Sequence, residues 1–150
     1  MKIKIFFYMF LSMFFIFIMQ GCNPTGIVGI DESITIDGIE FSVSSVVRKN
    51  EYSAGGQVSK PKSSADIILV VQADLSAGNE EVNPHEWKFS VVDENGRIDK
   101  PDRTNFMSGI INGENRNVLE LIFGVDKNSD SFTLILLDNE IVLDSLISEN

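Results

Sequence analysis

The stretch Ile67-Ile68-Leu69-Val70-Val71-Gln72-Ala73-Asp74-Leu75 decides the fold class of this chain. It opens with five consecutive apolar residues and then alternates strictly between apolar and polar side chains from Val71 to Leu75. Alternation with a period of two is typical of a strand with one face in the core, whereas a continuous apolar run indicates burial on both faces. The stretch therefore predicts a strand that is covered on both faces at its beginning and on one face at its end.

Other segments of the chain repeat this alternation. It slips once, at Ser44-Ser45, which predicts a β-bulge. Turn-forming residues follow two of the segments, at Asp93-Glu94-Asn95-Gly96 and at Asp138-Asn139. About seven short strands separated by turns predict an all-β fold, an immunoglobulin-like antiparallel β-sandwich over residues 33–150. The alternating segments are Ile34–Ile36, Ile39–Val43, Trp87–Val91, Leu119–Phe123 and Phe132–Leu136, and the apolar run Ile141–Leu143 follows the last turn.

A charged and then apolar N-terminus indicates export. Lys2 and Lys4 precede Ile5–Met19, which contains no charged residue. At about 15 residues, this run has the length of a signal-peptide core and is short of the roughly 20 residues that span a bilayer as a helix. Residues 1–21 are therefore predicted to be a signal peptide and are excluded from the core.

The apolar run ends at Met19-Gln20-Gly21-Cys22, which resembles the lipobox of bacterial lipoproteins. The resemblance implies cleavage after Gly21, acylation of Cys22 in the manner of palmitate-bearing lipoproteins, and a tether over residues 22–32. The first two residues of the motif depart from the usual Leu and Ala or Ser. An uncleaved N-terminal anchor, with Cys22 as an ordinary thiol, is therefore the alternative.

The chemistry of the single cysteine supports lipidation. Cys22 is the only Cys, so it forms no intramolecular disulfide, and exported proteins rarely leave one thiol free. Two or three acyl chains anchor a protein stably, at about 0.8 kcal/mol per buried methylene. By resemblance to Gram-negative sorting rules, Asn23 favours the outer membrane. We therefore expect an exported lipoprotein that faces the periplasm or the cell exterior.

The net charge limits the classes of partner. Removing residues 1–21 takes away two of the 12 basic side chains and none of the 22 acidic ones, so the remaining charge is 10 − 22 = −12. Nucleic acid requires a basic face, so no nucleic acid partner is expected. The expected partners are the membrane, through the lipid, and a protein of the envelope or the cell exterior.

The residues that carry enzyme chemistry are scarce. His85 is the only His and follows Pro84 before a predicted strand, so a Ser/His/Asp or Cys/His arrangement has little to build on. A zinc site lacks a second His or Cys. We therefore predict no catalytic residue and no cofactor.

Calcium is the one ion that a local pattern suggests. Asp126-Lys127-Asn128-Ser129-Asp130 places oxygen-bearing side chains at alternate positions, as the start of an EF-hand loop does. Ser131 stands where the loop has Gly, and Leu137 stands where it has the bidentate acid. These departures favour a polar β-turn between two strands over a metal site.

Two segments are candidate binding loops. Lys49–Asp66 is rich in Gly, Ser and Lys, and its Tyr52, Lys60 and Lys62 form a local basic patch; the alternative is a flexible connection. Thr104–Ile111 carries Phe106 and Met107 outside the clearest strands. Its apolar residues belong either to the core, which is the commoner case, or to a ligand surface.

Several motifs resemble those of the secreted, telokin-like immunoglobulin domains of bacterial lipoproteins. The resemblance covers about 100 residues, implies the fold and an extracytoplasmic setting, and carries over no catalytic residue. Asn112 and Asp126 replace a turn Pro and a strand-end Pro of the family pattern. The motifs are Lys60-Pro61-Lys62, Ile67–Val71, Val91–Gly96, Asn112-Gly113-Glu114 and Phe123-Gly124-Val125-Asp126.

These observations favour a lipid-anchored, non-catalytic binding or protein-interaction module. It is expected to contact another envelope protein or an external ligand through loops at one end of the sandwich. The alternative is a passive structural or assembly accessory of an envelope or secretion complex, which needs only an open sheet edge for β-augmentation. An enzyme, which needs clustered carboxylates in a pocket, is a distant third.

Overall fold

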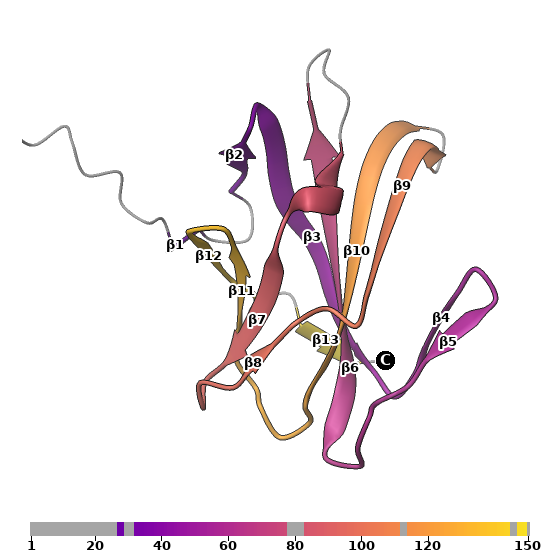
Figure 1. Cartoon of the computed structure of the whole chain (residues 1–150), viewed down its shortest axis with the longest axis vertical. Helices are drawn as coiled ribbons and strands as arrows, with labels where there is room; N and C mark the ends of the chain where they lie inside the picture. Colours follow the sequence, from indigo (N-terminus) through magenta and orange to yellow (C-terminus); the bar gives the residue numbers. More distant parts are fainter. Residues whose placement is uncertain (1–26, 29–31, 78–82, 112–113, 145–146, 150) are drawn as a thin grey trace, which may run out of the picture.

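The computed structural model describes residues 27–28, 32–77, 83–111, 114–144 and 147–149 (Figure 1). The described elements are thirteen strands and one short 3-10 helix. They are β1 (Ile27–Val28), β2 (Ile34–Ile36), β3 (Ile39–Lys49), β4 (Tyr52–Ala54), β5 (Gln57–Ser59), β6 (Asp66–Ser76), η1 (Pro84–Glu86), β7 (Phe89–Asp93), β8 (Ile98–Asp99), β9 (Arg103–Ile111), β10 (Glu114–Asp126), β11 (Phe132–Leu136), β12 (Asn139–Val142) and β13 (Ile147–Glu149).

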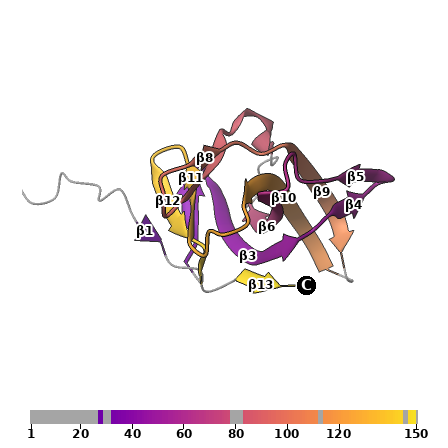
Figure 2. The same cartoon turned by 90° about the horizontal axis from the view of Figure 1, so that it is seen from below.

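The strands form two packed sheets and a separate hairpin. Sheet A has the order β1-β12-β11-β7-β8, and sheet B has the order β13-β3-β6-β10-β9, with β2 paired to β3. The hairpin β4-β5 lies beside sheet B (Figure 2). All pairs are antiparallel except β1 with β12 and β13 with β3. The predicted all-β, antiparallel sandwich is thus confirmed; seven of the described strands have four or more residues, and the others have two or three.

Strand β6 lies in the middle of sheet B, between β3 and β10. Its Leu69 and Val71 belong to the main core between the sheets, and its Ile68 and Val70 are buried on the opposite face. Tyr52 and Ala54 of the hairpin cover that second face together with Ile122. The double burial predicted for the beginning of this strand is therefore confirmed, and the hairpin is what covers it.

Large apolar side chains fill the space between the sheets. Phe41, Phe123 and Phe132 are fully buried there. The single Trp87 is only half-buried. It packs edge-on against Phe41, with 6.2 Å between ring centroids, and so lies at the rim of the core.

The predicted irregularities are confirmed at two positions and shifted at a third. The pairing of β3 with β6 changes register between Val43 and Ser45, which is the expected bulge. The turn after β7 closes with a bond from Gly96 N to Asp93 O of 3.0 Å, and Gly96 has φ +80°. The turn after β11 is formed by Leu137 and Asp138, one residue earlier than predicted, with Leu137 at φ +56°.

Two segments that were predicted to be loops contain strands. Residues 49–66 hold the hairpin β4-β5, whose three residue pairs run from Tyr52↔Ser59 to Ala54↔Gln57. Residues 104–111 belong to β9, which pairs with β10 along its whole length. Gly, Ser and Asn interrupt the apolar-polar alternation in both segments, so the strands were not recognised from periodicity.

The predicted signal peptide lies outside the described residues, and so do Gly21, Cys22 and most of the tether. Within the described part of the chain, no helix is long and apolar enough to span a membrane.

Candidate interaction surfaces

Tyr52 anchors the hairpin on sheet B and is not a free binding residue. Its hydroxyl donates a hydrogen bond to Glu120, a carboxylate that is only 8% exposed. Gln72 Nε2 donates to the other Glu120 oxygen at 2.8 Å, and Asn105 Nδ2 donates at 3.4 Å. Burial and the hydrogen bond to the Glu120 carboxylate raise the pKa of Tyr52 to about 12. This arrangement is a satisfied, buried network beneath the hairpin.

The two lysines of the predicted basic patch are exposed and paired. Lys60 Nζ lies 3.7 Å from Glu51, and Lys62 forms a hydrogen-bonded ion pair with Asp102. The bond to Asp102 raises the pKa of Lys62. Because each lysine has an acidic partner and Tyr52 is buried, the three residues do not form one basic surface.

Phe106 and Met107 follow each other in β9 and lie on opposite faces of sheet B. Phe106 is half-buried against the main core, whereas Met107 is 40% exposed. Met107 lies opposite Val118 of β10 on the outer face. The structure therefore does not bring these two residues to one surface.

Strand β9 forms one edge of sheet B. Its nine residues pair with β10 from Arg103↔Ile122 to Ile111↔Glu114, and no described strand pairs with its other side. Residues 104–111, TNFMSGII, contain no charge and no Pro. Natural edge strands usually carry charged residues or Pro, or are very short, because these features prevent unwanted pairing with another strand. The uncharged run was visible in the sequence, but the edge position was not.

Arg103, at the beginning of β9, connects this edge to the hairpin. Its Nε donates to Asn105 Oδ1 at 2.8 Å, and its Nη2 donates to the carbonyl of Ala54 at 3.3 Å. Its Nη1 is buried and makes no hydrogen bond within the described residues. The hairpin thus supports the first residue of β9 and leaves the remainder of the edge open.

A charged cluster joins the two sheets at one end of the sandwich. Arg97 binds Asp66 at 2.8 Å and Asp99 at 2.9 Å, and its Nη2 donates to the carbonyl of Gly124 at 3.3 Å. The hydrogen bond from Arg97 lowers the pKa of Asp66. Since these groups satisfy one another, the cluster has a structural role.

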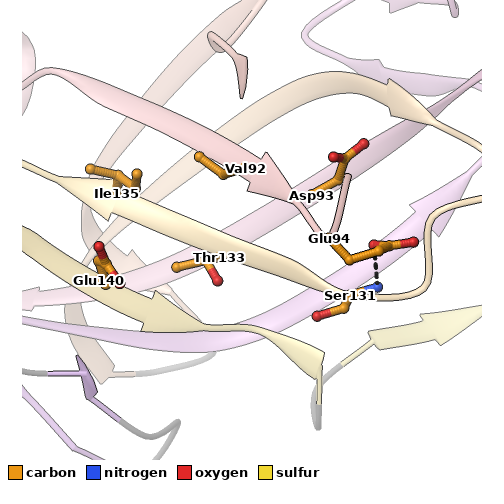
Figure 3. A pocket seen from close by; sticks show the side chains of 7 residues that line it. All are labelled: Val92, Asp93, Glu94, Ser131, Thr133, Ile135 and Glu140. Atoms are coloured by element: carbon orange, nitrogen blue, oxygen red, sulfur yellow. Dashed lines mark hydrogen bonds between the residues drawn. The ribbon is translucent and has the colours of Figure 1, made fainter. Parts of the chain in front are cut away.

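In the described part of the chain, each of the two sheets has a shallow hollow on its outer face. The hollow on sheet B, of about 370 Å³, holds two partnered pairs, Arg116 with Asp74 and Ser76 with Glu40. The hollow on sheet A, of about 180 Å³, is shown in Figure 3. It is lined by Val92, Asp93, Glu94, Ser131, Thr133, Ile135 and Glu140.

The residues considered for calcium form a turn between β10 and β11. Asp126 Oδ1 accepts hydrogen bonds from the backbone N–H and the side chain of Asn128, at 2.9 and 3.1 Å. The hydroxyl of Ser129 donates to Asp93 at 3.0 Å. Among the described residues, no three His, Cys, Asp or Glu side chains are grouped so as to hold a metal ion. His85 lies within η1.

No protein-family model matches the sequence, and no curated protein is significantly similar to it. The fold is similar to two solved structures. One is an uncharacterised β-sandwich protein from Clostridium difficile, with a TM-score of 0.53 and 12% identity over 77% of this chain and 90% of that one. The other is a conserved hypothetical protein from Bacillus anthracis, with a TM-score of 0.52 and 12% identity over 76% and 93%. At this identity, the similarity establishes the β-sandwich fold alone.

Proposed function

We propose that this chain is a lipid-anchored, non-catalytic interaction protein of a bacterial cell envelope, which binds a partner protein by strand addition at β9. The observation that carries the proposal is the open edge of this nine-residue strand, which is uncharged over residues 104–111. Unpaired amide and carbonyl groups on such an edge bind an extended segment as an additional strand. This mode, which the sequence suggested for an assembly accessory, is better supported than binding through the loops.

The other sheet edges support the choice of β9. The other edge strands of the described sheets are β1, β2, β8, β13 and the two strands of the β4-β5 hairpin, and each of these has only two or three residues. Very short edge strands offer few hydrogen-bonding groups to a partner. Strand β9 alone combines length with the absence of charge on residues 104–111.

The path of the tether adds a geometric argument. With lipid on Cys22, four residues lie between the anchor and Ile27 at β1, and the five steps from Cys22 to Ile27 span at most about 18 Å in an extended chain. Both views place β1 and β9 on opposite sides of the domain (Figures 1 and 2). An anchor at Cys22 would thus hold the β1 side near the membrane and leave β9 accessible. The resemblance to telokin-like lipoprotein domains agrees with this setting.

The anchor is tested by the intact mass of the protein purified from its own membrane fraction. We expect a chain that begins at Cys22 and carries acyl groups, and a Cys22→Ala variant that lacks them. A mass that retains residues 1–21 would contradict the lipoprotein part of the proposal and leave the β9 part standing.

The β9 edge is tested by photocross-linking in intact cells. A benzoylphenylalanine at Met107 is expected to cross-link a defined partner, whereas the same group at Val58, exposed in the hairpin, is not. Ser108→Lys places a charge on the edge and is expected to abolish the cross-link while the melting temperature stays close to that of the wild type. Equal cross-linking from Val58, or no effect of Ser108→Lys, would refute strand addition at β9.

A further inference from the structure

We infer that the hollow on the outer face of sheet A is a docking site for a lysine or arginine side chain of a partner protein. This site is on the other sheet from β9 and does not depend on strand addition there. The inference rests on an apolar floor, two carboxylates at its ends, and the absence of any basic residue in its lining.

The floor of the hollow consists of side chains from two paired strands. Val92 of β7 lies opposite Thr133 of β11, and Ile135 lies two residues further along β11. These three residues are half-buried. Ile98, which pairs with Val92 on the same face, is 65% exposed and extends the apolar surface toward β8. The methyl groups of this floor are suited to the hydrocarbon stem of a long side chain.

The two carboxylates lie at opposite ends of this floor, with Thr133 between them (Figure 3). Glu140 is exposed and lies opposite Ile135 in the sheet, and its side-chain carboxylate makes no hydrogen bond or ion pair with any described residue. Glu94 accepts hydrogen bonds from the backbone N–H groups of Ser131 and Asp130, at 3.1 and 3.3 Å. These bonds hold the Glu94 carboxylate in place and leave its charge without a cationic partner among the residues that line the hollow.

The third carboxylate of the lining, that of Asp93, already accepts hydrogen bonds within the chain. Asp93 is buried and accepts bonds from the backbone N–H groups of Asn95 and Arg97, at 2.9 and 2.8 Å, and from Ser129. The guanidinium of Arg97 is directed to Asp66 and Asp99. The charge that faces the hollow is therefore that of Glu94 and Glu140.

Lysine and arginine match this arrangement because they carry an apolar stem and a cationic end. A purely apolar side chain would desolvate the carboxylates without pairing them, which is unfavourable. An anionic ligand would be repelled. The volume of about 180 Å³ is below the roughly 300–1,000 Å³ of small-molecule pockets, so the hollow has room for one side chain and not for a drug-sized ligand.

The net charge of the domain also indicates which class of partner binds in the hollow. Residues 22–150 carry 10 basic and 22 acidic side chains, so a second copy of this chain would bring like charge to the site. The same argument disfavours nucleic acid and anionic lipid. A basic segment of another protein gains from the acidic field of the whole domain, which speeds its encounter with the site.

The test uses the full chain, solubilised from its membrane, and a fluorescein-labelled Gly-Val-Lys-Val-Gly amide as the probe. Fluorescence anisotropy is expected to show saturable binding that weakens with added salt, and no binding of matched probes with norleucine or Glu in place of Lys. Glu140→Gln is expected to raise the Kd about two- to fivefold, which is the range for a partly exposed ion pair. Glu51→Gln, the same charge change beside the hairpin, is expected to leave the Kd unchanged.

A second variant places the cation within the chain itself. Thr133→Lys puts an ammonium between Glu94 and Glu140 and is expected to abolish probe binding while the circular dichroism spectrum is retained. The inference is overturned by any of four results: no saturable binding of the Lys probe, equal binding of the norleucine probe, equal effects of Glu140→Gln and Glu51→Gln, or unchanged binding by the folded Thr133→Lys variant.

Discussion

The hydroxyl of Tyr52 donates a hydrogen bond to the carboxylate of Glu120 and so ties the β4-β5 hairpin to strand β10 across 68 positions of the sequence. Beneath this contact, the hairpin covers Ile68, Val70 and Ile122 and forms a second, smaller core on the outer face of sheet B. The hairpin is thus part of the packed structure, because lifting it would expose both the apolar side chains and the buried carboxylate.

Tyr52→Phe is expected to lower the free energy of unfolding by about 1–3 kcal/mol, since it leaves the buried Glu120 without one of its donors. Gln72 and Asn105 continue to donate to this carboxylate, which favours the lower part of the range. Urea denaturation measures the change. An unchanged midpoint would mean that the hydroxyl does not hold the hairpin.

The raised pKa of Tyr52 predicts a loss of stability at high pH. The protonated hydroxyl is favoured in the fold, so its contribution is complete below pH 10 and disappears as the pH rises toward about 12. Tyr52 is the only Tyr outside the first 21 residues, so in a chain that lacks those residues the ultraviolet absorbance of tyrosinate reports on Tyr52 alone. The wild type is expected to lose more stability between pH 10 and 12 than Tyr52→Phe; equal losses would contradict the assignment.

The lowered pKa of Asp93 predicts that the protein loses stability at low pH. Burial alone would raise the pKa of Asp93, but hydrogen bonds from the Arg97 backbone, Ser129 and the Asn95 backbone hold it below its ordinary value of 3.8. The resulting stability is present above that value and is lost as the pH falls through the lowered pKa. Asp93→Asn keeps an oxygen for the turn amides but does not titrate, so its acid denaturation curve is expected to be flatter than that of the wild type. Asp138→Asn, at an exposed turn, controls for the change in net charge and is expected to follow the wild-type curve.

The positive φ of Leu137 predicts that a substitution at this position stabilises the protein. Its φ of +56° lies in the left-handed region, which costs roughly 1–2 kcal/mol for a residue with a side chain, and its side chain is exposed. Leu137→Gly is expected to raise the melting temperature, with a net gain of up to about 1 kcal/mol after the greater flexibility of the unfolded chain is counted. Asp138→Gly, at a neighbouring position without a positive φ, is expected to lower it. A fall in both variants would contradict the assigned backbone strain.

Phe106 and Met107 differ in burial, which predicts different effects of the same substitution. Phe106→Ser is expected to lower the free energy of unfolding by about 1.5–3 kcal/mol, less than for a fully buried Phe because the ring is only half-buried. Met107→Ser is expected to change it by no more than about 0.5 kcal/mol. Urea denaturation distinguishes the two, and similar midpoints would show that Phe106 does not belong to the core.

The local pattern of apolar and polar residues was sufficient to predict a strand wherever these residues alternate over several positions. The segment predicted from Ile67 to Leu75 is β6, Asp66–Ser76, and the bulge at Ser44-Ser45 is present. Both follow from side chains that alternate between faces, which is a property of neighbouring residues. The turn at Leu137 was displaced by one position because Leu rarely adopts a positive φ, so composition indicated the following Asp and Asn.

The candidate sites were only partly visible in the sequence. Residues 49–66 and 104–111 were identified as segments of interest, but Tyr52 is buried against the distant Glu120 and Lys62 is paired with the distant Asp102. Lys60 is paired with Glu51 of its own segment. The distant partners, such as Glu120, depend on which strands become neighbours. A scan of residue types therefore finds charged positions without showing which of them are already neutralised.

By itself, the amino-acid sequence determined that the chain is an acidic β-protein, because the period of apolar residues, the composition and the charge are properties of the chain that do not require strand pairing. The tertiary structure alone decided that β9 is an edge, that a hairpin covers the second face of β6, and that Glu94 and Glu140 lie at the two ends of one apolar hollow. These relationships arise from contacts between residues far apart in the sequence. They depend on the order of strands in each sheet. That order is selected because both sheets must bury their apolar faces against a common core.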